Sequence, residues 1–140
     1  MRVEAYLRVV GDESKIRALQ EETNLPNASI NPLKARKGTS DEEVWWNWQT
    51  ERTPVDPDNP DEGLRALLQA HRSIFPSLKK DQAEKDIYLE VVTHYEEGEE
   101  PQGLYLSAET VQLLSEMGGA LDNDVIVTVA GTSRNADRDG

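Results

Sequence analysis

The stretch Val3-Glu4-Ala5-Tyr6-Leu7-Arg8-Val9-Val10-Gly11-Asp12 lies near the N-terminus and decides the fold. Its apolar side chains recur at every second position, which is the period of a β-strand with one face on a core. Gly11 ends the apolar run, and Asp12 has the side chain of a helix N-cap. The sequence therefore predicts a half-buried strand that leads directly into a helix.

Outward from this unit, the same reasoning predicts four more strands and two more helices. The four strands cover residues 29–35, 44–50, 87–92 and 125–129. The helix of the opening unit begins after Asp12, and the two further helices begin after Asn59 and Ser107. Asn59 and Glu62 have the spacing of a capping box, and Pro60 suits the first helical position. We expect this second helix to end or kink at Pro76, and residues 51–59 to form a loop.

The resulting order, β-α-β-β-α-β-α-β, predicts an α+β fold. We expect a single mainly antiparallel sheet with helices on one face. The first six elements suggest a ferredoxin-like β-α-β-β-α-β core, to which a C-terminal α-β unit is added. With 140 residues, the chain is expected to form one domain over residues 1–130, followed by a disordered polar tail at 131–140.

The charge of the chain narrows its expected partners. The formal net charge is −12, with +2 on residues 1–38 and −14 on the rest. Such a surface repels nucleic acid and anionic membranes and attracts basic proteins. The alternative is that the acidity only keeps the protein soluble. The one basic cluster is Lys34, Arg36 and Lys37. The chain has no cysteine and no apolar run of membrane-spanning length, so we expect a cytoplasmic protein without disulfides or thiolate chemistry.

Several short motifs resemble those of a known family. They are Gly11-Asp12, Leu25-Pro26, Lys37-Gly38 before a tryptophan-bearing strand, Phe75-Pro76, Leu104-Tyr105-Leu106-Ser107-Ala108-Glu109, Leu113-Leu114, Met117-Gly118 and Leu121-Asp122-Asn123-Asp124-Val125. Over about residues 3–129 the chain resembles the bacterial family of domains of unknown function numbered 4279 (DUF4279). The resemblance implies a compact α+β fold and supplies no activity and no site residues.

No candidate catalytic or metal-binding motif in the sequence meets the residue pattern that its chemistry requires. His71 lies on the apolar stripe of the second helix, where a packed structural role is expected. His94 with Glu96 or Glu97 lacks a third ligand at a diagnostic spacing. The acids between Asp56 and Glu62 fail the EF-hand pattern because Pro60 and Asp61 occupy its third-ligand and glycine positions. We therefore expect no catalytic residues, no cofactor and no metal.

The sheet face away from the helices is the candidate binding surface. Alternation places ten residues on it: Tyr6, Arg8, Trp45, Asn47, Gln49, Tyr88, Glu90, Val92, Ile126 and Thr128. Of these, Tyr6, Arg8, Trp45, Asn47, Tyr88 and Glu90 are the predicted partner-binding residues, because exposed aromatics are typical of interfaces. Alternatively, a second chain or the C-terminal tail covers this face, so the chain is expected to be a monomer or a homodimer through it.

Three functional hypotheses follow. The first is a non-enzymatic protein-interaction module, for example an immunity-like or antitoxin-like inhibitor of a basic partner. The second is a small-molecule-binding regulatory domain of ferredoxin-like type. The third is a hydrolase that uses paired carboxylates or His94.

Overall fold

The computed structural model describes residues 1–33, 44–100 and 102–129, which form one mixed six-stranded sheet and four α-helices. The predicted basic cluster at Lys34, Arg36 and Lys37 and the predicted tail at 131–140 lie outside the described residues. The strands are β1 (Arg2–Gly11), β2 (Ser29–Pro32), β3 (Trp46–Gln49), β4 (Thr53–Val55), β5 (Asp86–Glu96) and β6 (Ala120–Thr128). The helices are α1 (Glu13–Thr23), α2 (Pro60–Ala70), α3 (Phe75–Lys79) and α4 (Ala108–Met117), with 3₁₀ turns at Arg72–Ile74 and Gln82–Glu84.

The sheet is organised around β1. Its strand order is β2-β3-β1-β5-β6, and β4 also pairs with β1. Every pair is antiparallel except β5 and β6, which run parallel and are joined through α4. The α+β prediction is confirmed, while the ferredoxin-like topology stays a prediction. Strand β4 and the parallel strand β6 lie outside the predicted six-element core.

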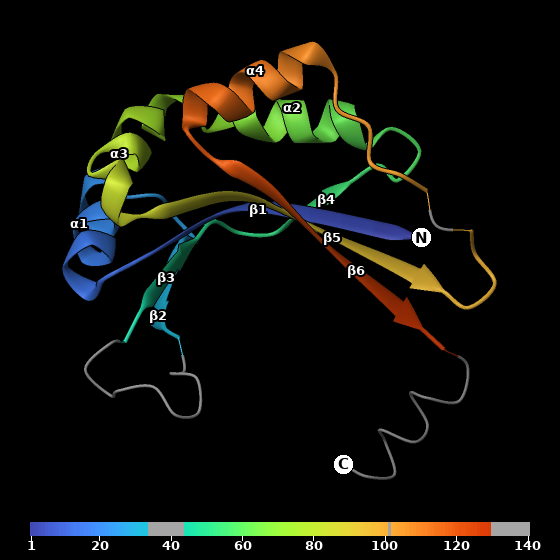
Figure 1. Cartoon of the computed structure of the whole chain (residues 1–140), viewed down its shortest axis with the longest axis horizontal. Coiled ribbons are helices and arrows are strands. Elements are labelled where there is room, and N and C mark those ends of the chain that lie inside the picture. Colours follow the sequence, from blue (N-terminus) through green and yellow to red (C-terminus); the bar gives the residue numbers. More distant parts are fainter. Residues whose placement is uncertain (34–43, 101, 130–140) are drawn as a thin grey trace, which may run out of the picture.

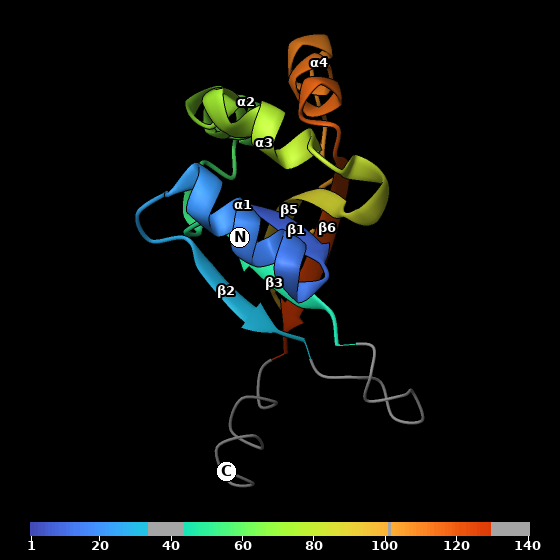
Figure 2. The ribbon, with the colours of Figure 1, turned by 90° about the vertical axis from the view of Figure 1, so that its left-hand side faces the viewer.

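The hydrophobic core lies between the sheet and the helices, which gather on one side of it (Figures 1 and 2). The alternating residues Val3, Ala5, Leu7 and Val9 are all buried there, as the opening stretch predicts. Facing them are buried side chains of all four helices, including Ile16, Leu19, Leu64, Leu68, Leu78, Leu113 and Met117. Burial of these apolar surfaces is the main force that holds the helices on the sheet.

Local signals set the ends of two helices as predicted. Asp12 accepts a hydrogen bond from the Lys15 amide at 2.9 Å and caps α1. Ser107 accepts one from the Thr110 amide at 3.3 Å and caps α4. Gly118 then ends α4 in the left-handed conformation, with φ of 75°, which glycine adopts without a steric penalty. None of the helices in the described parts of the chain combines the length and apolar character needed to cross a bilayer.

Three local predictions were wrong. The second helix breaks at His71, and Pro76 instead stands in the first turn of α3, where its missing amide costs no hydrogen bond. The capping box does not form. The side-chain Nδ2 of Asn59 donates to the Glu62 carboxylate at 3.0 Å, and the Asn59 side chain accepts no hydrogen bond from a backbone amide of the helix. The expected loop at residues 51–59 contains strand β4.

Strands β3 and β4 are two halves of one strand, interrupted by a β-bulge. Arg8 lies opposite Gln49, and Ala5 lies opposite Thr53. Two residues of β1 separate these pairs, whereas three residues, 50–52, separate them on the other strand. An extra residue of this kind bends a strand and increases its twist. Because of the extra residue, the core-facing side chains have even numbers before the bulge, as at Trp48, and odd numbers after it, as at Val55.

Thr50 holds the bulge to β1. Its amide donates to the Leu7 carbonyl at 3.0 Å, and its hydroxyl oxygen accepts from the Leu7 amide at 3.0 Å. Both residues are buried, so water cannot replace these bonds. The side chain of Thr50 therefore supplies a backbone partner that the interrupted ladder lacks.

We predict that Thr50→Val lowers the free energy of unfolding by about 1–3 kcal/mol, because it leaves the buried Leu7 amide without an acceptor. Urea unfolding followed by tryptophan fluorescence measures the change. Thr50→Ser keeps the hydroxyl and should retain most of the stability. Equal losses in the two variants would show that the methyl group, and not the hydrogen bond, matters.

Candidate functional site

The six predicted partner-binding residues differ widely in exposure. Tyr6, Asn47 and Glu90 are buried on the face away from the helices, and Arg8 and Tyr88 are partly buried. Only Trp45 is largely open, at 52%. In the described structure, direct contact with a partner is therefore restricted to Trp45, Tyr88 and part of Arg8. That these residues bind a partner stays a prediction.

Arg8 links three strands on this face. From β1, its Nε donates to Asn47 Oδ1 on β3 at 2.6 Å, and its Nη1 donates to Glu90 Oε1 on β5 at 3.2 Å. Asn47 in turn donates to Gln49 at 2.9 Å and to Asn31 on β2 at 3.3 Å. The network engages both the oxygen and the nitrogen of the Asn47 side-chain amide and holds one oxygen of Glu90.

Tyr6 occupies the place next to this network. The guanidinium of Arg52, which lies in the bulge, stands over the Tyr6 ring at 5.0 Å from its centre. Burial, and then the nearby Glu90 carboxyl, raise the pKa of the Tyr6 hydroxyl, while Arg52 and Arg8 oppose the shift. The hydroxyl is thus held neutral at physiological pH. The bulge explains how Arg52 comes to cover this part of the face.

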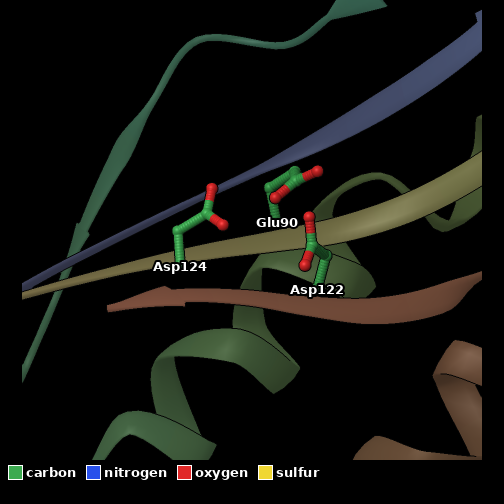
Figure 3. A group of neighbouring side chains, drawn as sticks. All are labelled: Glu90, Asp122 and Asp124. Atoms are coloured by element: carbon green, nitrogen blue, oxygen red, sulfur yellow. The ribbon is translucent and has the colours of Figure 1, made fainter. Parts of the chain in front are cut away.

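An acidic cluster, formed by Glu90, Asp122 and Asp124, lies beside Arg8 and Tyr6. Parallel pairing sets Glu90 opposite Asp122, and Val92 opposite Asp124. One carboxylate oxygen from each of the three acids lies within 4.8 Å of the others. Figure 3 shows the three carboxyl groups on the same side of β5 and β6, turned toward a common space.

Sequence reasoning missed Asp122 and Asp124 as site residues. It began the last strand at residue 125, whereas β6 begins at Ala120 directly after the α4 stop. The period-two spacing of the two aspartates was the available signal. Their match to Glu90 required the parallel register, which no local pattern specifies.

Glu90 is a buried carboxyl group with a shifted pKa. Its side chain is only 1% exposed, although it is a carboxyl group. Burial, followed by hydrogen bonding with the Asp122 carboxyl, raises the pKa of Glu90 to about 7, and the Arg8 hydrogen bond opposes the shift. Asp124, Tyr6 and Arg52 are the other ionisable groups around this space. Glu90 therefore changes its charge near physiological pH.

The other sequence candidates lie elsewhere. His71 Nδ1 is 3.0 Å from the Leu67 carbonyl at the end of α2, which is consistent with a structural role. His94 Nε2 is buried, lies 3.5 Å from Glu4 Oε1, and has no hydrogen-bond partner in the described residues. Asp61 accepts from the Ser107 amide at 2.8 Å and joins α2 to the start of α4.

A separate pocket of about 240 Å³ opens between the loop before α2 and the segment before α4. Its lining includes Val3, Asn59, Thr93, Tyr95, Leu104 and Asn123. Thr93 and Tyr95 are bonded to Asn123 and Gln102 within the chain. The pocket is smaller than the range of roughly 300–1,000 Å³ typical of sites for drug-sized ligands.

Strand β6 stands at the end of the strand order, so its outer edge carries no further strand in the described residues. Val125, Ile126 and Val127 are each about half exposed on it. Adjacent apolar residues on an unpaired edge are unusual, because natural sheets protect such edges from pairing. This edge is therefore the most accessible apolar surface next to the acidic cluster.

Comparison with known proteins places the chain in one family. The model of a family described as "Domain of unknown function (DUF4279)" matches residues 1–128. This confirms the resemblance found in the sequence motifs. No curated protein and no solved structure matches the chain.

We predict that the isosteric variant Glu90→Gln changes the dependence of stability on pH. Because folding raises the Glu90 pKa from 4.5 to about 7, its stabilising contribution is complete below pH 4.5 and is lost as the pH rises through 7. Relative to the wild type, Glu90→Gln should gain on the order of 1–3 kcal/mol in unfolding free energy between pH 5 and pH 8. Chemical unfolding across this range measures the gain.

Glu96→Gln is the control, because it removes an exposed glutamate from the same strand. It should show no comparable gain. A Glu90→Gln variant whose stability runs parallel to the wild type from pH 5 to pH 8 would contradict the burial of a titrating Glu90.

Proposed function

The chain belongs to the DUF4279 family, whose description assigns no activity. From the geometry of the structure, we propose that the protein is a non-enzymatic interaction module that binds a basic protein partner. The observation that carries the proposal is the free edge of β6 with Val125, Ile126 and Val127 exposed on it. An extended segment of the partner would add to the sheet there, with backbone hydrogen bonds supplying affinity.

Charge supports a basic occupant of this edge. Asp122 and Asp124 precede the exposed apolar residues on β6, and Glu96 lies opposite Thr128 at its far end. The chain as a whole carries −12. A second copy would bring the same charge and be repelled, whereas a basic partner would be steered toward the edge. An immunity-like or antitoxin-like inhibitor of a basic protein belongs to this class.

A hydrolytic role receives less support from the same cluster. A carboxyl group with a pKa near 7 beside two carboxylates is an arrangement that acid–base catalysis also uses. Carboxyl pairs that act on a glycosidic bond, however, stand about 5 Å or more apart to hold the bond between them. The oxygens here share a space of 4.8 Å or less, which suits a small cation better than a substrate.

A second candidate function is small-molecule regulation. The order β2-β3-β1-β5 of antiparallel strands supports the ferredoxin-like core that this role assumes. The pocket of about 240 Å³ is the observation in its favour. A metabolite that raises the melting temperature saturably, and fails to do so after Leu104→Trp fills the pocket, would favour this candidate.

The test of the interaction proposal uses the double variant Val125→Lys/Val127→Lys. It keeps the exposed strand but replaces its apolar surface with charges that repel a basic partner. Proteins from the native host are captured on the wild type and on the variant at low and high salt. We expect a basic protein that the wild type retains at low salt, that high salt weakens, and that the double variant binds at least tenfold more weakly once purified.

Val111→Lys is the matched control, because Val111 is equally exposed but lies on α4. It should bind the partner as the wild type does. Hydrogen exchange on the purified complex should show protection of the β6 amides. Absence of a salt-sensitive partner, equal binding by the double variant, or a stable homodimer through β6 would each overturn the proposal.

A further inference from the structure

One oxygen of Glu90 has no partner in the described residues. Arg8 donates to Oε1, whereas Oε2 is completely buried and has no hydrogen-bond donor when the neighbouring acids are ionised. The Asp122 carboxyl can share a hydrogen bond with Glu90 only while one of the two groups holds a proton. A buried carboxylate oxygen without a partner costs several times more free energy than a surface one. Such an oxygen requires a proton or a cation.

The carboxyl group of Glu90 is turned toward the space that it shares with Asp122 and Asp124 (Figure 3). The buried carboxyl group of Glu90 and the two aspartates therefore face the same space. Glu90 forms the floor of this position, while Asp122 is half-buried and Asp124 is exposed at its entrance.

The separation of the oxygens fits a particular size of ion. Ca²⁺ binds oxygen at about 2.3–2.6 Å, so ligands on opposite sides of it lie up to about 5 Å apart. Mg²⁺, at about 2.0–2.1 Å, draws opposite ligands to about 4 Å. The ligand atoms of the cluster lie within 4.8 Å of one another, which is inside the span of opposite ligands around Ca²⁺. Ca²⁺ also tolerates irregular ligand geometry better than Mg²⁺ does. Water would complete the coordination on the exposed side.

The local charge fits a divalent ion as well. Three ionised carboxylates and the guanidinium of Arg8 sum to −2. A single divalent cation neutralises this charge, whereas a proton or a monovalent ion leaves the cluster negative.

From these observations we propose that Glu90, Asp122 and Asp124 form a binding site for one divalent cation, with Ca²⁺ preferred over Mg²⁺. The ion would tie β6 to β5 through side chains as well as through backbone. The proposal is independent of the partner-binding role of the β6 edge.

Isothermal titration calorimetry at pH 8 tests the proposal with the full chain, metal-free buffer and Ca²⁺, Mg²⁺ or Mn²⁺ as the probe. We expect one ion per chain, tighter binding of Ca²⁺ than of Mg²⁺, and a melting temperature that rises with Ca²⁺. Glu90→Gln should abolish the binding, and Asp122→Asn or Asp124→Asn should weaken it at least tenfold.

Asp86→Asn is the matched control, since Asp86 lies on the same strand and at the same face as Glu90 but outside the cluster. It should bind Ca²⁺ like the wild type, and NaCl at equal ionic strength should not reproduce the thermal shift. No saturable binding of any of the three ions, or equal weakening by Asp86→Asn, would overturn the proposal in favour of a proton shared between Glu90 and Asp122. Circular dichroism of each variant separates loss of binding from loss of folding.

Discussion

The bulge at residues 50–52 is the constraint on which the open face depends. It lets β1 pair with β3 along one half and with β4 along the other, and Thr50 supplies both hydrogen bonds that join the halves at Leu7. The sheet is curved, and β2 with β3 runs away from the helices on one side while β5 with β6 runs away on the other (Figure 1). The bulge also positions Arg52 over Tyr6, so it shapes the wall of the acidic cluster.

A buried charge follows from this geometry. A flat sheet would leave Glu90 in water, where its carboxylate would need no partner. Here the carboxyl group is enclosed, held by Arg8 at one oxygen and left open at the other. Natural chains retain such an arrangement at some expense in stability, and a raised pKa with a specific charge partner is typical of functional sites. Two acids of the cluster, Asp122 and Asp124, and the exposed apolar residues 125–127 thus lie along the same strand, β6.

Local patterns in the sequence were sufficient for the elements but not for the site. The alternation from Val3 to Val9 predicted β1 and its buried face, and the caps at Asp12 and Ser107 predicted two helix starts, because these signals act over a few residues. The bulge and the parallel register of β5 and β6 are long-range, and they decide whether Tyr6 and Glu90 are open or buried. Sequence reasoning therefore named Glu90 but expected it to be exposed, and it left out Asp122 and Asp124.

The carboxyl groups of Glu90, Asp122 and Asp124 surround one position beside Arg8. Anomalous diffraction from a crystal grown at pH 8 with Mn²⁺, an oxygen-binding ion visible by its own signal, examines that position directly. The account predicts one strong peak within coordination distance of Glu90, Asp122 and Asp124, with Arg8 still bonded to the other Glu90 oxygen. A map with no peak there, while Glu90 and Asp122 lie in direct contact, would contradict it.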